Sequence, residues 1–387
     1  MGTIKDQSPI KSVKGREIAT IPRLLLFVHA GGRCEFDGCN KYLLEHPLTL
    51  TSGNFAQVAH VVAFSVAGPR GKTSFRPANI NDVSNLMLLC PQCHKLIDDH
   101  PERYSRSILE EQKHQHEDRI KHLTGLGPEL RTTIFQLKAK IGGQSVDIPV
   151  SQVADAVYPR YPDDKKGFVI DLTSFGEESP AFFQLASEEI KRRIDSLYAP
   201  GMNADRTRHI SLFALAPIPL LIFLGKQLSN KIAVDPYQRH RDTEDWVWKT
   251  SGEPVTYRFN RLRYGTDISK VALVLSLSGV IHLNDLPAEI NDRFYVYEIT
   301  LGIPSPNPTF LKTREALTEF KNIYQLSLRS IMRDHGTELR AIELFPAVPA
   351  PVAIICGREL LPKVDPALKI YDFDKAKGGF IFKLEVK

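Results

Sequence analysis

The sequence predicts a two-domain protein, with a small α+β domain pinned by metal in front of a larger α/β domain. Three observations predict this arrangement. Four cysteines form two close pairs within the first hundred residues. A Gly-Leu-Gly-Pro stop signal at residues 125–128 ends a long amphipathic segment. Strand-like and helix-like segments then alternate to the last residue, which is typical of a doubly wound parallel sheet.

The cysteine pairs are spaced as zinc ligands. Cys34 and Cys39 are separated by four residues, and Cys90 and Cys93 by two. Two tight turns of this kind deliver four soft thiolates to a tetrahedral Zn²⁺. Four protein ligands leave no open coordination position, so we expect the zinc to be structural. The fifth cysteine, Cys356, lies in the apolar run PVAIICG and is expected to be buried.

The chain between and beyond the cysteine pairs predicts a ββα unit. Residues 55–65 are expected to form a strand that presents His60 on one face. A Gly-Pro-Arg-Gly turn follows at residues 68–71, and residues 85–89 read as a second strand. A helix is expected to begin at Cys93.

A second helix is predicted over residues 101–123. Its expected apolar face carries Tyr104, Ile108, Leu109, Ile120 and Leu123. The first domain is therefore predicted to span residues 1–124. Residues 125–164 are expected to form a linker region with a β-hairpin around Gly142-Gly143.

The remaining residues, 165–387, carry a weak internal repeat. The segment HISLFALAPIPLLIFLGKQL at 209–228 aligns with LRAIELFPAVPAPVAIICGREL at 339–360. We predict two Rossmann-like pseudo-repeats over about 165–265 and 266–387, with a crevice at the carboxyl ends of their strands. The alternative is a chance likeness between two βαβ units.

Composition places few limits on the partner. The net charge of +5 is compatible with a polyanion but does not require one. No apolar stretch reaches the roughly 18 residues of a membrane span, and the N-terminus lacks an apolar signal core. A metal-type cysteine pattern without a disulfide framework favours a reducing compartment. We therefore predict a cytoplasmic protein that does not associate with membranes.

Two histidines supply the candidate chemistry of the first domain. His60 on a strand and His94 at a helix start are expected to converge on one cleft, with Asn85 nearby in the sequence. This set suits phosphodiester hydrolysis, in which one imidazole takes a proton from water and a hard divalent cation binds the scissile phosphate. The alternative is that either histidine only hydrogen-bonds a thiolate or packs.

The second domain has a candidate nucleotide-binding segment. Cations would bind phosphates and flat side chains would stack on bases. The candidates in this segment are Gln238, Arg239, Trp246, Trp248 and Lys249. The competing interpretation of the two tryptophans is that they pack a hydrophobic seam.

Two more cations occupy equivalent positions in the repeat. Lys226 and Arg358 each follow a proline turn and a glycine. They either face the phosphates of a bound ring symmetrically or are solvated helix residues.

Residues 30–122 resemble the HNH nuclease (ββα-metal) family. AHVVAFS supplies the first His, SNLMLLC the Asn, and CPQCHKLID the second His. The resemblance implies that His60 is the general base, that His94 binds a catalytic Mg²⁺, and that Asn85 fixes the loop between the strands. The sequence departs from many members of the family at Ala59, where they have an acidic residue or a histidine. The metal shell must then be completed by another ligand, and the candidates are Gln57, Asn54 and water.

The second domain resembles SAVED domains, which sense cyclic oligonucleotides and are built from two CARF-like halves. The segments that carry the resemblance are APIPLLIFLGKQL, PAPVAIICGREL and DPYQRHRDTEDWVWK. An HNH domain ahead of a SAVED domain is similar to an effector type of bacterial cyclic-oligonucleotide antiphage (CBASS) defence. The resemblance implies largely non-specific cleavage of double-stranded DNA. It also implies activation by a cyclic di- or trinucleotide that drives a homo-oligomer, a dimer or a larger assembly.

Two other functions fit parts of the sequence. One is a restriction endonuclease whose C-terminal domain reads modified DNA. The other is a zinc ribbon that binds DNA or protein without cleavage. A plain ribbon needs none of His60, Asn85 and His94, which favours the nuclease.

Overall fold

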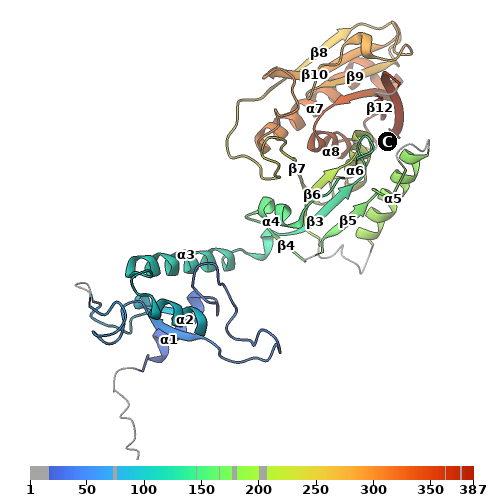
Figure 1. Cartoon of the computed structure of the whole chain (residues 1–387). Helices are drawn as coiled ribbons and strands as arrows, with labels where there is room; N and C mark the ends of the chain where they lie inside the picture. Colours follow the sequence, from blue (N-terminus) through green and yellow to red (C-terminus); the bar gives the residue numbers. More distant parts are fainter. Residues whose placement is uncertain are drawn as a thin grey trace, which may run out of the picture. The chain divides into compact units, whose positions relative to one another are not determined.

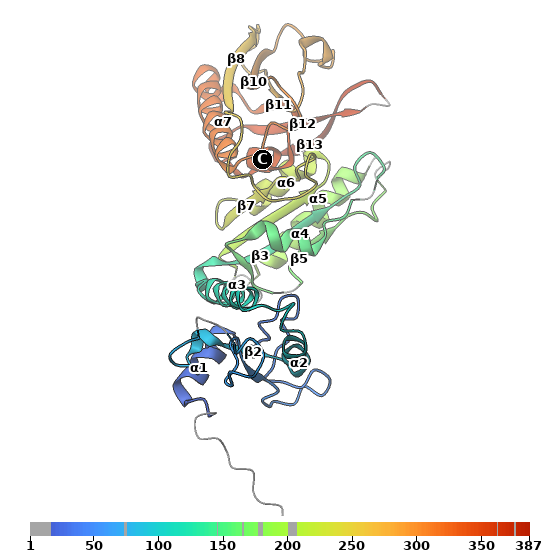
Figure 2. The same cartoon turned by 60° about the vertical axis from the view of Figure 1, so that its left-hand side comes forward.

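The chain forms two compact units in a computed structural model, residues 1–127 and 128–387. Figure 1 and Figure 2 show their secondary structure. The structure describes residues 17–72, 76–144, 146–164, 166–176, 181–199, 207–361, 363–374 and 377–387.

The N-terminal unit is a ββα unit flanked by two further helices. Its elements are α1 (Thr20–His29), β1 (Gln57–His60), η1 (Val83–Asn85), β2 (Leu86–Leu89), α2 (Pro91–Asp99) and α3 (Arg106–Thr124). Strand β1 pairs antiparallel with β2, and His60 lies opposite Leu86. All four residues of β2 are buried, which explains its unbroken apolar run. Cys90 caps the N-terminus of α2, and Pro91 occupies its first turn.

Helix α3 differs from the prediction in its start and in its buried face. It begins at Arg106 because the Ser105 hydroxyl caps Ile108 N–H. The buried residues of α3 are Leu109, Lys113 and His116. Two of the three are polar, so a pattern of apolar residues alone could not locate this face.

The C-terminal unit contains two sheets. The first has β3 (Arg131–Lys138), β4 (Tyr161–Pro162), β5 (Phe168–Asp171), β6 (His209–Leu215) and β7 (Ala233–Tyr237). All of its strand pairings are parallel. Its helices are α4 (Val150–Val157), α5 (Phe182–Leu197) and α6 (Ile218–Leu228).

The second sheet has six strands in the order β13-β12-β11-β9-β10-β8. They are β8 (Thr256–Arg263), β9 (Val271–Ser276), β10 (Tyr295–Ile303), β11 (Ala341–Ala347), β12 (Ala367–Asp374) and β13 (Gly379–Val386). The outer strands β8 and β13 are antiparallel to their neighbours, and the four inner strands are parallel. Its helices are α7 (Arg314–His335) and α8 (Ala350–Arg358). Helix α7 packs on β8 (Figure 2) and also on α8.

The two sheets share one topology. Within its sheet, the first half has neighbouring strands in the order β5-β3-β6-β7, and the second half has them in the order β10-β9-β11-β12. When β4, β8 and β13 are left out, each half therefore places its second, first, third and fourth strands along the chain side by side. This shared order, which is that of a doubly wound fold, supports the predicted duplication.

The predicted linker region is wrong in one respect. Residues 131–138 form β3, the central strand of the first half, which pairs in parallel with β5 and β6. At Gly142-Gly143 the described residues form a single antiparallel bridge, which joins Ile141 to Gln144. The partners of β3 lie further along the chain, with Phe135 opposite Phe168 and Thr133 opposite Ile210, so the local turn signal suggested a hairpin instead. The first half thus begins near residue 128 instead of residue 165.

Helices α6 and α8 hold equivalent places in the two halves and pack on each other (Figure 1). A Cβ atom at Gly225 would lie 2.1 Å from the Ile354 carbonyl oxygen, and one at Gly357 would lie 1.9 Å from the Ile222 carbonyl oxygen. Each helix thus uses a glycine to bring its backbone against the other.

Among the described residues, no helix combines the length and apolar character needed to cross a membrane.

Candidate functional site: a cysteine cluster and two histidines

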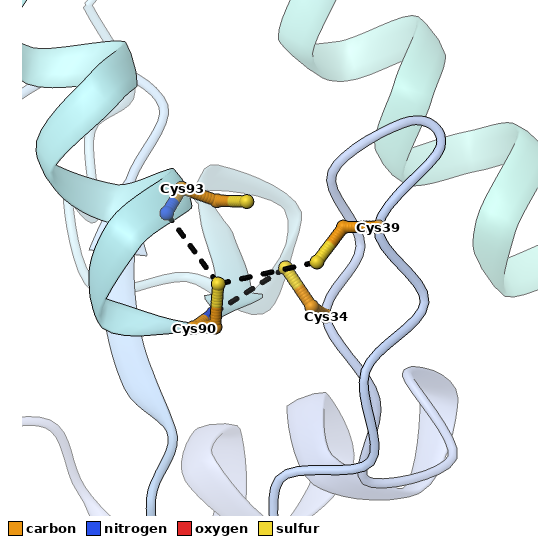
Figure 3. Close-up of side chains that lie close together, drawn as sticks. All are labelled: Cys34, Cys39, Cys90 and Cys93. Atoms are coloured by element: carbon orange, nitrogen blue, oxygen red, sulfur yellow. Dashed lines mark hydrogen bonds between the residues drawn. The ribbon is translucent and has the colours of Figure 1, made fainter.

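The four predicted cysteine ligands come together in the N-terminal unit. Their Sγ atoms all lie within 4.8 Å of one another (Figure 3). Cys34 and Cys39 come from the loop after α1, whereas Cys90 and Cys93 lie at the start of α2. The Cys34 Sγ accepts a hydrogen bond from Cys90 N–H at 3.3 Å, and the Cys90 Sγ accepts one from Cys93 N–H at 3.4 Å. This cluster fits a tetrahedral metal ion.

A buried contact between Glu35 and Lys113 lies next to Cys34 in the chain. The Glu35 carboxylate is 1% exposed and accepts a hydrogen bond from Leu88 N–H in β2. Lys113 of α3 places its Nζ 3.8 Å from Glu35, and it also pairs with Glu117. Burial raises the pKa of Glu35 to about 8, although the charge of Lys113 opposes this shift. These contacts join the loop of Cys34 to β2 and α3, and sequence patterns gave no sign of them.

His60 ends strand β1 and is half-buried. Its Nε2 lies 2.9 Å from Asn81 Oδ1, and its ring contacts the edge of Phe64 with 6.2 Å between centroids. The chain directly after His60 is held by Asn85. Asn85 Oδ1 accepts from Val62 N–H at 2.9 Å, and its Nδ2 donates to Val62 and Ile80 carbonyls at 3.0 and 2.9 Å. This geometry supports the loop-fixing role expected for Asn85.

His94 lies in the first turns of α2 and has two polar neighbours. Its Nδ1 is 2.6 Å from Gln57 Oε1 on β1, and its Nε2 is 3.5 Å from Asp98 Oδ2 one turn further along α2. Asp98 was not among the predicted ligands. The His94-x3-Asp98 spacing places both side chains on one face of a helix, so the sequence did contain this signal.

Arg70 links the surroundings of the two histidines. Its guanidinium donates to the Val61 carbonyl at 2.7 Å and to the Ile97 carbonyl at 2.7 Å. It also pairs with Asp98 Oδ1 at 3.2 Å. One nearly buried side chain therefore joins the residue after His60 to the carboxylate beside His94.

The predicted nucleotide ligands have mixed outcomes. Trp246 is fully buried, and its ring packs edge-on against Phe213, so the structure contradicts its expected stacking on a base. Trp248 is 8% exposed and lines a pocket of about 360 Å³ together with Tyr158, Lys249 and Arg314. Lys249 is paired with Asp245 at 2.9 Å.

Lys226 and Arg358 each bind a backbone carbonyl of the other half. Lys226 Nζ donates to the Leu360 carbonyl just past α8, and Arg358 Nη2 donates to the Ile232 carbonyl past α6, both at 3.1 Å. Burial lowers the pKa of both side chains. The structure contradicts the predicted phosphate contact, because each cation binds backbone beyond the end of the opposite helix.

The segment after β7 has an unusual number of buried polar atoms without a partner. Within the described residues, five such atoms lie between residues 238 and 248. They are Gln238 Oε1, Arg239 Nη1, His240 Nε2, Trp246 Nε1 and Trp248 Nε1. Buried polar groups normally have hydrogen-bond partners, so this segment has unused capacity to bind water or a ligand.

Residues 190–386 match the family model described as "SMODS-associated and fused to various effectors sensor domain", or SAVED. This match spans just over half of the chain. The chain belongs to the SAVED family. Residues 34–101 of this SAVED protein match the model described as HNH endonuclease. Both expected domains are thus confirmed, and HNH endonucleases are enzymes that hydrolyse phosphodiester bonds.

Solved structures similar to this SAVED protein include Cap4 SAVED/CARF-domain containing receptors. The Acinetobacter baumannii receptor with the cyclic trinucleotide 2'3'3'-cAAA is 15% identical, with a TM-score of 0.45, and the match covers 80% of this chain and 64% of that chain. The same receptor with 3'3'3'-cAAA is 12% identical, with a TM-score of 0.42 and coverage of 73% and 62%. The Moraxella osloensis receptor is 12% identical, with a TM-score of 0.38 and coverage of 76% and 60%. The SAVED protein spans less than two thirds of the length of these receptors. No curated protein matches its sequence.

Proposed function

We propose that this SAVED protein is a metal-dependent endonuclease of double-stranded DNA that a cyclic oligonucleotide activates. The observation that carries the proposal is that one chain holds an HNH domain and a SAVED sensor domain. In the HNH domain, Arg70 joins the carbonyl of Val61, next to His60, to the Asp98 carboxylate beside His94. Such a protein would act as a CBASS effector in the cytoplasm. The sensor domain explains how a nuclease with little sequence preference is kept inactive.

The cysteine cluster would hold a structural Zn²⁺. Burial raises the pKa of the Cys34 thiol to about 12, so Cys34 would be protonated in the bare cluster at neutral pH. A bound Zn²⁺ would stabilise the thiolate and release this proton. The four sulfurs fill its coordination shell, so zinc would have no position left for substrate.

A second, harder cation would bind beside α2. Gln57 Oε1 can only accept a hydrogen bond, so His94 Nδ1 carries the proton and its Nε2 carries a lone pair. That lone pair and an oxygen of Asp98 face the same space, 3.5 Å apart. His94 and Asp98 therefore fit Mg²⁺, which prefers oxygen ligands and keeps several waters. When bound, the ion would stabilise charge on the scissile phosphate and the leaving oxygen.

The protein groups around this site would have separate tasks. His60 would take the proton from the attacking water. Asn85 would fix the chain after His60 through its bonds to Val62. Arg70 would hold Asp98 and the end of β1 in one arrangement.

The segment at residues 238–249 is our candidate for the cyclic di- or trinucleotide site. Its five buried polar atoms without partners support this choice. Trp248, Lys249 and Arg314 in the adjacent pocket offer an aromatic face and cations. Gln238 and Arg239 complete the candidate set. Binding would favour a homo-oligomer in which the nuclease is active.

Plasmid digestion with Mg²⁺ tests the proposal, with and without a panel of cyclic di- and trinucleotides. Light scattering on the same samples would follow the size of the oligomer. We expect cleavage and assembly only with one class of cyclic nucleotide. Full activity with Mg²⁺ alone would contradict the sensor role, and no cleavage under any condition would contradict the nuclease role.

The His60→Ala variant tests the base. We expect it to lose cleavage, by at least about 100-fold, while its zinc content and cyclic nucleotide binding stay unchanged. Cleavage of plasmid at the wild-type rate would show that another group activates the water.

A further inference from the structure

We propose that two side-chain amides, Asn81 and Gln57, are positioning residues that give His60 and His94 opposite tautomers. The inference rests on the proposed nuclease function. It assigns tasks to two residues that neither touch the metal nor take part in proton transfer. A base and a metal ligand both need a free lone pair, but each needs it on a particular ring nitrogen.

Asn81 determines which nitrogen of His60 is free. Its Oδ1 lies 2.9 Å from His60 Nε2, and an amide oxygen can only accept. The proton of neutral His60 therefore sits on Nε2, and Nδ1 keeps the lone pair. Asn81 is itself held in place, because its N–H donates to Asn79 Oδ1 at 3.1 Å.

Charged groups around His60 are engaged elsewhere. Arg70 and Arg76 donate to the carbonyls of Val61 and Phe64. Asp82, in the turn before β2, caps Ser84. On the neighbouring helix α2, the His94 imidazole and the Asp98 carboxylate contact each other. Within the described residues, the hydrogen bond found for the His60 ring is the one to the neutral Asn81 amide.

Gln57 favours the opposite tautomer in His94. Its Oε1 lies 2.6 Å from His94 Nδ1, so the proton sits on Nδ1 and Nε2 is free on the side of Asp98. Gln57 and His60 are the two ends of the four-residue strand β1. One short strand thus supplies both the base and the amide that orients the metal ligand. Gln57, a candidate metal ligand from the sequence, is therefore not expected to bind the metal, because its oxygen is already bound to His94.

The first test is nitrogen NMR of the full chain, labelled at histidine and freed of Mg²⁺ with its zinc retained. The His60→Ala and His94→Ala variants assign the two rings. We expect His60 to be protonated at Nε2 and His94 at Nδ1. The same tautomer in both rings, or the reverse assignment, would overturn the proposal. This readout does not need a cleaving enzyme, so it separates the failure of this inference from the failure of the proposed function.

The second test compares variants that keep or lose the acceptor. Asn81→Asp keeps an oxygen toward His60 and is expected to cleave within about threefold of wild type. Asn81→Leu is expected to lower kcat about 10- to 100-fold with KM for DNA unchanged. Gln57→Leu is expected to weaken Mg²⁺ binding, measured by calorimetry, by about 10- to 100-fold.

Gln115→Ala is the matched control, because the exposed Gln115 amide donates a hydrogen bond to Glu111 on the same helix, α3. It should behave as wild type in both assays. Equal kcat for Asn81→Asp and Asn81→Leu, in proteins with full zinc content, would show that the acceptor has no role. Unchanged Mg²⁺ binding by Gln57→Leu would do the same for Gln57.

Discussion

At the scale of single residues, Asp98 is a further candidate ligand in the proposed metal site. Many HNH domains have an acidic residue or histidine where this chain has Ala59, which is a buried residue of β1. Asp98 offers a carboxylate from α2 instead. Its two oxygens are divided between Arg70 and the face of His94. In the proposed metal site, Asp98 of α2 would therefore supply the carboxylate that β1 lacks at Ala59.

The Asp98→Asn substitution tests this division. We expect Mg²⁺ affinity to fall about 10- to 100-fold, because an amide is a weaker ligand and no longer balances Arg70. Asp99→Asn is a matched control, since Asp99 is the next residue and pairs with exposed Lys95. The Mg²⁺ concentration for half-maximal cleavage would be measured for both. Equal shifts in the two variants would mean that general charge, and not the position of Asp98, matters.

At the scale of elements, the backbones of α6 and α8 approach each other closely at Gly225 and Gly357. Gly225 and Gly357 stand at equivalent positions of the repeat, and a side chain at either would meet a backbone carbonyl. Backbone cannot move aside as a flexible side chain can. The alignment of these two glycines in the sequence therefore marked a real contact between the halves.

Gly225→Ala and Gly357→Ala are each expected to lower the free energy of unfolding by about 2 to 3 kcal/mol. Gly279→Ala is the control, because nothing lies within 4 Å of a Cβ atom at that position. Urea unfolding followed by circular dichroism would measure all three. A loss at Gly279 as large as at Gly225 would contradict the packing argument.

An acidic residue in the middle of β7 joins the first half to helix α7. Asp235 contacts Arg314 at 2.9 Å and His209 at 3.3 Å. Burial alone would raise the pKa of Asp235, but these two partners outweigh burial and lower it to about 2. The folded state therefore favours the ionised form.

Asp235→Asn should cost about 1 to 2 kcal/mol of stability at pH 7, after allowance for solvent screening. Because the folded pKa lies below the unfolded value, this stabilisation is present above about pH 4 and is lost as the pH falls toward 2. The difference in unfolding free energy between wild type and variant should therefore shrink on acidification. A difference that grows between pH 7 and pH 3 would contradict the assignment.

Elements with strong local signals were predicted well. The strand expected over residues 85–89 is β2, Leu86–Leu89, because its apolar run is unbroken and fully buried. The convergence of the four cysteines followed from their spacing in the sequence. Strand β3 was misread because its partners β5 and β6 are remote in sequence. The proposed task of Asn81 depends on a contact with His60 that exists only after folding, so no local pattern could assign it. Asp98, four residues after His94 on α2, could have been found from its helical spacing.

At the scale of the whole molecule, the cysteine cluster belongs to one unit only. All four cysteines lie before residue 127, and the core of that unit is small. Small domains often need a metal to complete their stability. The larger unit has its own extensive core.

Removal of zinc should therefore act on one unit. We expect the Cys93→Ser variant to lose bound zinc and to lose protection from hydrogen exchange between residues 17 and 127. Residues 128–387 should keep their protection. Cys356→Ala is the control, because this buried thiol lies in α8 and far from the cluster in sequence. Equal deprotection of both units would show that their stabilities are coupled.

Lys226 of α6 and Arg358 of α8 each bind the opposite half, which affects whether either half can be produced alone. Lys226 binds the chain beyond α8, and Arg358 binds the chain beyond α6. Either half produced alone would leave an apolar helix face bare and a partly buried carbonyl without its donor. We therefore expect neither half to fold without the other, and truncation between them should yield aggregates instead of a half-sized sensor.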